Sequence, residues 1–532
     1  MGHCGSLQVP GGISPQTGFS LSHWYTAFML VPMTPSLPNS SPETQGLPAR
    51  AVQNFVEAAE SAGLELHAFV LLRRGHLIAQ GAWAPFTLDQ PHALFSVSKS
   101  FTSTAVGLAV GESLLSIDDP VLSFFPEFRP EVVGGHLAAM RVRDLLTMTS
   151  GHADDVTGAL QEGQPQHWAQ SFLAQPVEFQ PGTHFVYNSG ATYMLAAIVE
   201  RLSGQPLLDY LRPRLFEPLG IGEATWEPNV EGITVGGWGL SLRAEDLACL
   251  GELYRQKGVW KDRQALGEEV LPWRLKDARI LSEDWVEQAT SAQIQGDGSG
   301  PHDWNQGYGF QFWRCQHGAY RADGALGQFI VVMPEQEAVL AVNSAVDNMQ
   351  SVLDLVWAHL LPAFEPGPLT PEPGALERLQ HKCGHLELAP VAGLLDSPFA
   401  VWLGGRSYTF EPNVLGLSEL RLGGLDGQAE LSLNTSEGGF PLVAGLGTWA
   451  VNHTRFDHVS TLDLSRDRRV AACAAWTASG TLEVHLNYLE TAATHVLKLR
   501  FEQGGERLTL ESSSQTSFRV LEPLTLEGTL AR

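Results

Sequence analysis

The sequence predicts a chain of two parts. The first is an α/β (α+β) domain, in which terminal helices cover one face of an antiparallel sheet and an all-helical lobe lies beside it. The second is a C-terminal all-β sandwich or barrel. Up to residue 361 the patterns run in the order helix, strands, helical insert, strands, helix, which favours the first architecture. After a proline- and glycine-rich stretch at 365–374, short alternating runs separated by turn residues favour the second.

These patterns divide the chain into four segments. A change from mixed to purely β patterning marks the main boundary, and the proline-rich stretch has the composition of a linker. The N-terminal stretch is rich in Pro, Ser and Gly, so we expect it to be poorly ordered. The expected segments are an N-terminal arm at 1–45, the α/β domain at 46–364, a linker at 365–380 and an all-β accessory domain at 381–532.

The composition limits the partners of the chain. It has 532 residues, of which 44% are hydrophobic, enough for more than one sizeable core. The formal net charge of -25 argues against nucleic acid and anionic membranes as partners, because both attract basic surfaces. The five cysteines are widely spread and form no C-x-x-C pair, so we expect neither a disulfide framework nor a zinc site.

The N-terminal stretch lacks the features of an export signal. No Lys or Arg occurs before Arg50, so the positively charged region of a signal peptide is missing. The apolar run at 24–33 is too short to span a bilayer. We therefore expect a cytoplasmic protein without a signal peptide or a transmembrane segment.

The α/β domain is expected to begin with a helix and a hairpin. Apolar residues recur at helical spacing at 47–62, and two β-rich runs fill 67–83. A helix of small residues begins at Ser96, and a short helix at 142–151 is expected to end at Gly151. The further elements expected are a helix at 191–204, a turn followed by a helix at 236–258, a charged surface insertion at 260–280, strands at 307–313, 320–333 and 338–344, and a final helix at 349–361.

Ser96 and Lys99 form the first candidate chemical group. Three positions apart on a helix, their side chains share one face. A serine hydroxyl is a poor nucleophile until a base takes its proton, and a lysine can do so if burial lowers its pKa from ~10.4 towards neutrality. The alternative is a helix start with a surface lysine. The setting favours the chemical interpretation, because the chain has few lysines and no other has a serine three positions before it.

Tyr187 and the glycines at 324 and 327 are the other candidates. Tyr187 lies just before a helix, where a tyrosine beside a lysine-activated serine is able to shuttle a proton; the alternative is an ordinary core tyrosine. Gly324 and Gly327 lie in the expected strands, where a missing side chain lets another group approach the backbone.

Three motifs together resemble the serine β-lactamase and penicillin-binding protein superfamily, specifically the class C β-lactamase-related serine hydrolases, which include esterases, amidases and D-aminopeptidases. The S-x-x-K motif falls at 96–99, the tyrosine motif, usually Y-x-N, at 187–189, and the third motif, usually K-T-G or H-x-G, at 322–324. The resemblance runs from about residue 48 to 361. It implies a β-lactamase-like fold and a serine hydrolase without metal or cofactor.

The resemblance also implies a role for each motif residue. Ser96 is then the acylated nucleophile, Lys99 its general base, and Tyr187 the group that exchanges protons with the leaving group and later with the deacylating water. The oxyanion hole is formed by the backbone N–H groups of Ser96 and Ala325, and one such donor is typically worth ~10²–10³ in rate.

Two departures from the motifs bear on the substrate. In the second motif the asparagine stands at 188 and Ser189 takes the third position, so a hydroxyl replaces the usual amide contact. In the third motif Ala322 stands where the family has a cation, and Asp323 and Gly324 follow. Without that cation a substrate carboxylate is disfavoured. We expect Ser189, Asp323 and Gly324 to bind a neutral or cationic ester or amide, and weak β-lactamase activity at best.

Two interpretations of the whole chain stay open. It is either a serine hydrolase acting on a small-molecule ester or amide, or a catalytically silent binding or assembly protein that keeps the fold, since a fold does not guarantee activity. The C-terminal domain is either a scaffold or dimerisation module, or a substrate gate. No nucleic acid or membrane partner is expected, and the sequence leaves the oligomeric state open.

Overall fold

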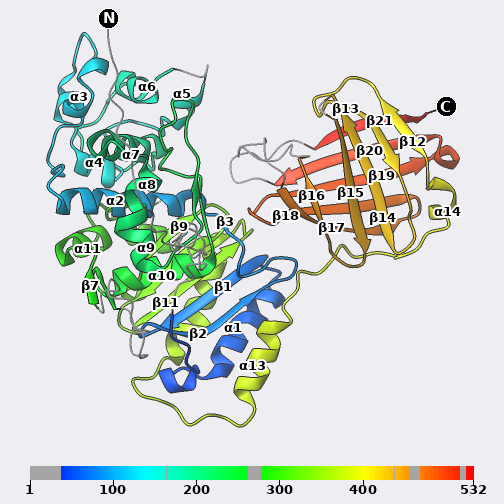
Figure 1. Cartoon of the computed structure of the whole chain (residues 1–532), viewed down its shortest axis with the longest axis horizontal. Helices are drawn as coiled ribbons and strands as arrows, with labels where there is room; N and C mark the ends of the chain where they lie inside the picture. The colour runs from blue at the N-terminus through cyan, green and yellow to red at the C-terminus, as the bar shows by residue number, and fades with distance from the viewer. Residues whose placement is uncertain are drawn as a thin grey trace, which may run out of the picture.

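The computed structural model shows an α/β domain followed by a C-terminal β-barrel (Figure 1). The chain passes from one to the other between helices α13 (Ala375–Gly384) and α14 (Ala400–Leu403). The expected fold class is confirmed. The structure describes residues 37–162, 166–261, 277–296, 298, 300, 302–436, 438–455, 468–515 and 523–531.

A six-stranded antiparallel sheet forms the centre of the α/β domain, in the order β2-β1-β11-β10-β9-β8. Strands β1, β10 and β11 are buried along their whole length, because helices cover both faces of the sheet. The expected hairpin of β1 and β2 and the expected strand at 338–344 are confirmed, whereas the expected strand at 320–333 is two antiparallel strands, β9 and β10, joined by a turn at 325–327. The strands are β1 (Leu66–Arg73), β2 (His76–Ala82), β8 (Trp313–Arg314), β9 (Tyr320–Gly324), β10 (Gln328–Met333) and β11 (Ala338–Ser344).

The helices from the two ends of the domain cover one face of this sheet, as expected. Helix α1 (Ala49–Ser61) packs beside α12 (Met349–Leu355) and beside the π-helical turn Val356–Leu360 that continues it. The helical period turns the apolar residues of α1 to one side. Phe55 therefore meets Phe69 of the sheet edge to face, with ring centroids 6.3 Å apart.

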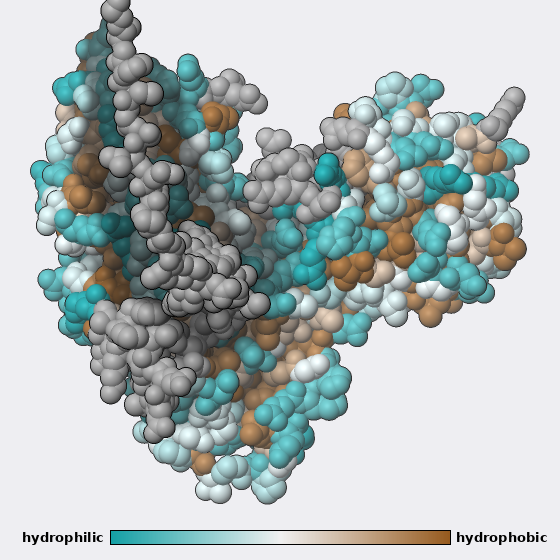
Figure 2. All heavy atoms as spheres, in the orientation of Figure 1, coloured by the Kyte–Doolittle hydropathy of each residue, from teal (hydrophilic) through white to brown (hydrophobic). Residues whose placement is uncertain are grey.

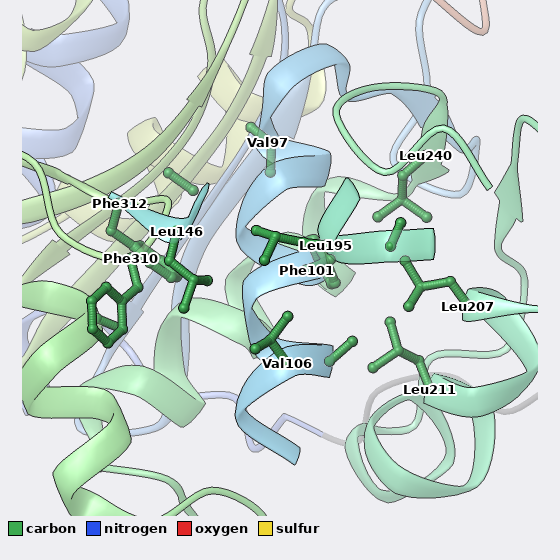
Figure 3. Close-up of a cluster of buried hydrophobic side chains, with 14 of the residues drawn as sticks. Val97, Phe101, Val106, Leu146, Leu195, Leu207, Leu211, Leu240, Phe310 and Phe312 are labelled. Atoms are coloured by element: carbon green, nitrogen blue, oxygen red, sulfur yellow. The ribbon is translucent and has the colours of Figure 1, made fainter. Parts of the chain in front are cut away.

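Helix α2 (Ser98–Gly111) lies on the other side of the sheet, with α10 (Ala244–Arg255) packed on β1, β10 and β11. The close-up in Figure 3 shows α2 between two groups of apolar side chains, which explains why the helix is buried nearly all round. This packing fixes the helix that begins next to Ser96. The labelled residues are Val97, Phe101 and Val106, with Leu146, Phe310 and Phe312 on one side and Leu195, Leu207, Leu211 and Leu240 on the other.

The expected all-helical lobe lies beyond α2 (Figure 1). Two small sheets accompany it, one of β3 (His92–Ala93), β5 (Leu240–Leu242) and β4 (Thr225–Trp226), the other of β6 (Val259–Lys261) and β7 (Asp277–Arg279). The helices are α3 (Gly135–Ala139), α4 (Val142–Leu146), α5 (Thr157–Gln161), α6 (Trp168–Ala174), α7 (Ser189–Ser203), α8 (Leu207–Leu211), α9 (Glu217–Leu219) and α11 (Glu283–Thr290).

Helix α4 and the expected strand at 307–313 are shorter than the sequence indicated. Helix α4 ends at Leu146, not at Gly151, because Met148 takes a φ of 58° that a helix does not tolerate. The expected strand at 307–313 is also wrong for all but its last residue. Gly307 and Gln311 have φ values of 104° and 63°, which interrupt the pleat, so only Trp313 joins the sheet.

The C-terminal domain is a closed barrel, one of the two expected alternatives. Strands β12 to β15 and β17 to β21 form the ring, which a parallel pairing of β15 with β17 closes, and β16 pairs with β17 beside it. Closure leaves the ring without a free edge. The strands are β12 (Ser407–Phe410), β13 (Leu417–Leu422), β14 (Gln428–Thr435), β15 (Gly438–Leu446), β16 (Ala450–Thr454), β17 (Arg468–Ala478), β18 (Thr481–Tyr488), β19 (Thr494–Glu502), β20 (Arg507–Gln515) and β21 (Leu524–Leu530).

The segments at the expected boundaries pack onto the α/β domain. Residues 37–45 are tied to it by Ser40 N–H, which donates to Leu77 O at 3.0 Å, and by the Glu43 carboxylate, which accepts from Ala49 N–H. Helix α13 starts inside the expected linker and packs against α1 and β2. Residues 1–36 of the expected arm and 262–276 of the expected surface insertion lie outside the described residues.

The surface is mixed in polarity. On the face in Figure 2, hydrophobic residues form small spots among hydrophilic ones. Within the part of the chain that the structure describes, no helix combines the length and the apolar character needed to cross a membrane.

The packing of α2 against α11 makes a prediction about stability. A Cβ built on Gly107 would lie 2.5 Å from the indole of Trp285, so Gly107→Ala should lower the thermal unfolding midpoint although alanine favours a helix. A Cβ on Gly111, in the same helix, meets nothing within 4 Å. Gly111→Ala should therefore raise stability, by roughly 0.5–1 kcal/mol. Equal effects of the two substitutions in thermal unfolding would contradict this packing.

Candidate active site

Ser96 lies in a short 3-10 turn, Phe95–Val97, between β3 and α2. The α-helix itself starts at Ser98, two residues later than the sequence indicated, so Ser96 precedes the helix and Lys99 lies in its first turn. Phe95 has a φ of 48°, in the left-handed region, which makes the turn abrupt. Ser96 stays partly exposed while the residues around it are buried.

Lys99 is buried next to Ser96, with three hydrogen-bond partners. Its ammonium Nζ lies 3.1 Å from Ser96 Oγ, 2.9 Å from Ser189 Oγ and 2.8 Å from the carbonyl oxygen of Gly237. Burial lowers the pKa of Lys99 to about 7, and the carboxylates of Asp155 and Asp323 limit this fall. Near neutral pH a substantial fraction of Lys99 is therefore an uncharged amine beside a hydroxyl.

Tyr187 joins this pair from the loop before α7. Its ring centroid is 4.9 Å from Lys99 Nζ, and its hydroxyl hydrogen-bonds the side chain of Ser96. The ring stacks on Trp313, with centroids 5.8 Å apart, and meets Tyr308 edge to face. Burial raises the pKa of Tyr187 above its usual range, so the phenol keeps its proton. The three residues expected to carry chemistry thus lie together.

In the second motif Asn188 begins the helix and Ser189 contacts Lys99. Asn188 is the N-cap of α7, and its side-chain oxygen accepts from Ala191 N–H at 3.4 Å. Ser189, the next residue, provides the hydroxyl that contacts Lys99. Asn and Ser are both good N-caps, so the exchange keeps the helix start and leaves a polar group at the lysine.

The third motif lies against the turn that carries Ser96. A Cβ built on Gly324, the last residue of β9, would be 2.2 Å from Leu94 O and 3.1 Å from Ser96 N. No residue with a side chain fits this approach without moving the turn. Ala325 follows directly, so the structure brings its backbone to the same side as Ser96.

Asp323 does not present a free charge. It lies on the same face of β9 as Arg321, and the two form an ion pair with Nη2 and Oδ2 2.9 Å apart. Arg321 is fully buried, with its guanidinium 4.1 Å from the ring centroid of Trp304, and it donates to Asp303 O at 3.0 Å. Ala322 points the other way, into the core. The pair carries no net charge, so Arg321 supplies no free cation for a substrate carboxylate.

One more carboxylate lies near Lys99. Asp155 is exposed, and its Oδ1 accepts from Ser189 N–H at 3.2 Å, which places it next to the residue that contacts Lys99. Across the described ranges, no three His, Cys, Asp or Glu side chains gather in a way that could hold a metal ion.

The beta-lactamase family model matches residues 49–360, more than half of the chain. The chain belongs to the beta-lactamase family. This is the family that the motifs resembled, and it is a family of serine hydrolases.

Several curated relatives of this beta-lactamase family chain carry hydrolase names. It is 33% identical to the D-aminopeptidase of Brucella anthropi over 29% of this chain and 31% of that protein. It is 25% identical to the 6-aminohexanoate-dimer hydrolase of Paenarthrobacter ureafaciens over 52% of this chain and 72% of that protein. It is 31% identical to the esterase EstB of Burkholderia gladioli over 29% of this chain and 43% of that protein. The matched regions thus span less than half the length of two of these three relatives.

Sequence reasoning missed several residues of this beta-lactamase family site. The contact of Lys99 with Gly237 O is made by the backbone, which leaves no signature in a sequence. Trp313 and Tyr308 lie in the expected strand at 307–313, and the sequence gives no sign that they pack on Tyr187. The pairing of Arg321 with Asp323 had a signal, because residues two apart in a strand share a face.

The buried ion pair makes a second prediction about stability. Asp323→Ala leaves Arg321 buried without its counter-charge, which should cost about 3–5 kcal/mol in the free energy of unfolding. Arg378 and Glu372 form an exposed pair in the same domain, with 49% and 55% of their side chains accessible. Glu372→Ala should change stability by less than about 1 kcal/mol. Urea unfolding of both variants tests this, and equal losses would contradict it.

Proposed function

We propose that the chain is a serine hydrolase that cleaves an ester or amide bond through an acyl-enzyme on Ser96, with Lys99 as general base and Tyr187 as proton shuttle. The observation that carries the proposal is a buried Lys99, with a pKa lowered to about 7, whose Nζ lies 3.1 Å from Ser96 Oγ. A base with a pKa near the working pH is the most effective for removing a hydroxyl proton.

The acceptors around Lys99 direct its lone pair towards Ser96. A neutral amine has two N–H groups and one lone pair. Gly237 O accepts one N–H at 2.8 Å because a carbonyl has no proton to give, and Ser189 Oγ accepts the second at 2.9 Å. The lone pair is left for the Ser96 hydroxyl, whose proton moves to Lys99 as Oγ attacks the substrate carbonyl carbon.

Tyr187 then serves the leaving group. Its raised pKa keeps the phenol protonated, and its hydroxyl lies next to both reacting groups. As the tetrahedral intermediate collapses, the phenol gives its proton to the departing alcohol or amine and regains one from the Lys99 ammonium. Water later attacks the acyl-enzyme along the reverse route, giving the acid and free Ser96.

The negative oxygen of each intermediate is held by two backbone donors, Ser96 N–H and Ala325 N–H. The close approach of Gly324 to Leu94 and Ser96 supports this assignment. Fixed donors of this kind need no reorganisation during the reaction, and loss of one typically costs ~10²–10³ in rate.

The charges around the site favour a neutral or cationic substrate over an anionic one. Arg321 is committed to Asp323, and Asp155 adds an exposed carboxylate beside Ser189. A substrate carboxylate would meet no free cation among these groups. The hydrolase names of the relatives support ester or amide cleavage, and we expect only weak hydrolysis of β-lactams.

A fluorophosphonate probe, which reacts with activated serines, tests the proposal. Wild-type protein should be labelled, Ser96→Ala should not, and Lys99→Ala should be labelled at least ~10²-fold more slowly because its base is missing. Ser98→Ala is the matched control and should be labelled like wild type. If the wild-type protein is not labelled, the proposed hydrolase function is wrong, and the alternative of a catalytically silent protein with this fold remains. Hydrolysis of p-nitrophenyl esters, D-amino-acid amides and nitrocefin then identifies the substrate class.

The lowered pKa of Lys99 predicts the pH profile. Protonated Lys99 cannot act as a base, so kcat/KM should rise with pH through about 7 and level off above it. Asp155 raises the pKa of Lys99, so Asp155→Asn should shift this limb to lower pH.

Asp154, the residue before Asp155, provides the control for this pH dependence of kcat/KM. Asp154 is also exposed but is not among the groups that act on Lys99. Asp154→Asn should leave the pH limb where it is. An unmoved limb in Asp155→Asn, or a kcat/KM that falls through about pH 7, would contradict Lys99 as the base.

A further inference from the structure

The turn between β18 and β19 belongs to the barrel but is buried against the α/β domain. Its residues include Leu489, Thr491 and Ala492, which are 1%, 3% and 0% exposed. Hairpin turns usually lie at the surface, so burial of this one requires a partner. Leu489 packs in a cluster with Phe86, and the residues after it contact the segment that leads to Ser96.

The first contact is a backbone hydrogen bond at β3. Ala93 N–H donates to Glu490 O at 2.8 Å, and the backbone of Thr491 hydrogen-bonds the ring of His92. Both residues of β3 also pair with β5, so this short strand is held by the α/β domain and by the barrel together. Ser96 follows three residues after Ala93.

The second contact is an apolar cluster around Ala492. Ala492 packs in one cluster with Phe95, Leu326 and Ala345, and Ala325 lies against it. Phe95 directly precedes Ser96, and Leu326 directly follows Ala325. The barrel thus contributes one methyl group to a cluster that flanks both proposed oxyanion donors.

Both flanking residues have a backbone conformation that needs support. The φ values of Phe95 and Leu326 are 48° and 60°, in the left-handed region, which costs a non-glycine residue roughly 1–2 kcal/mol. Such residues persist only where the surroundings hold them. The peptide group that carries the Ser96 N–H lies between Phe95 and Ser96, so relaxation of Phe95 would turn that donor away. Leu326 follows the residue that carries the second donor, so a shift of Leu326 would displace the backbone of Ala325.

We propose that the β18–β19 turn, through Ala492 and the Glu490 carbonyl, positions the oxyanion hole of Ser96 and makes the barrel part of the catalytic unit. This inference rests on the proposed function. Ala492 is a positioning residue, since it acts through Phe95 and Leu326 and need not touch the substrate. A larger side chain at 492 has no room and must displace one of them.

Ala492→Leu in the full chain is the main test. It should lower kcat for the best ester by about 10²-fold or more, as loss of an oxyanion donor does, with KM nearly unchanged. A phenylboronic acid, which forms a tetrahedral adduct on an active serine, should bind weaker by about the same factor. Ala492→Ser, of similar size, should restore both values.

Ala429→Leu is the matched control. Ala429 is also fully buried, but in the barrel core on β14, so its substitution strains the barrel away from the turn. It should leave kcat unchanged. If Ala492→Leu does not fold, as judged by thermal unfolding, Ala492→Gly replaces it and should lower kcat about fivefold, the effect of losing one buried methyl group.

The outcomes separate this inference from the proposed function. Absence of Ser96-dependent turnover in wild type would overturn the proposed function. With wild type active, a kcat close to wild type in folded Ala492→Leu, or in Ala492→Gly where the leucine variant does not fold, would overturn the positioning role. A loss confined to KM, or an equal loss of kcat in Ala429→Leu, would overturn it as well.

Discussion

The burial of one amino group organises this site. Lys99 lies in the first turn of a helix made almost wholly of small and apolar residues, and that setting lowers its pKa to about 7. A buried amine is tolerated only when its hydrogen-bonding groups are used, and Ser96, Ser189 and Gly237 use them. Two carboxylates keep the pKa from falling further. The arrangement therefore sets both the protonation state of the lysine and the direction of its lone pair.

The order of Asn188 and Ser189 shows which two hydrogen bonds the second motif provides. The helix start needs a side-chain oxygen that accepts a backbone N–H, and Asn188 provides it. The lysine needs an acceptor one residue further on, and the Ser189 hydroxyl provides it. Either residue type meets either need, so the motif letters change while the hydrogen bonds remain.

The sequence predicted the parts of the site that local spacing determines. Ser96 and Lys99 meet because a helix brings residues three apart together, and Gly324 is a glycine because only a bare backbone fits against Leu94. It could not predict partners that distant segments contribute through a backbone group or a small side chain, because neither has a sequence pattern of its own. The carbonyl of Gly237 and the methyl of Ala492 are of this kind. In the fold, the expected strand at 307–313 failed because positive φ values override an apolar, aromatic pattern.

The abrupt turn at Phe95 also explains why an accessory barrel lies so near the nucleophile. Its left-handed backbone lets Ser96 stay partly exposed while Lys99, three residues later, is fully buried. That conformation is unfavourable for phenylalanine, and the packing around it must supply the compensation. Phe95 packs in one cluster with Leu326 and Ala345 of the α/β domain and with Ala492 of the barrel, and Leu326 is itself in the left-handed region. The turn that carries Ala492 joins two paired strands, β18 and β19, so the barrel fixes the position of the methyl group that it adds to this cluster.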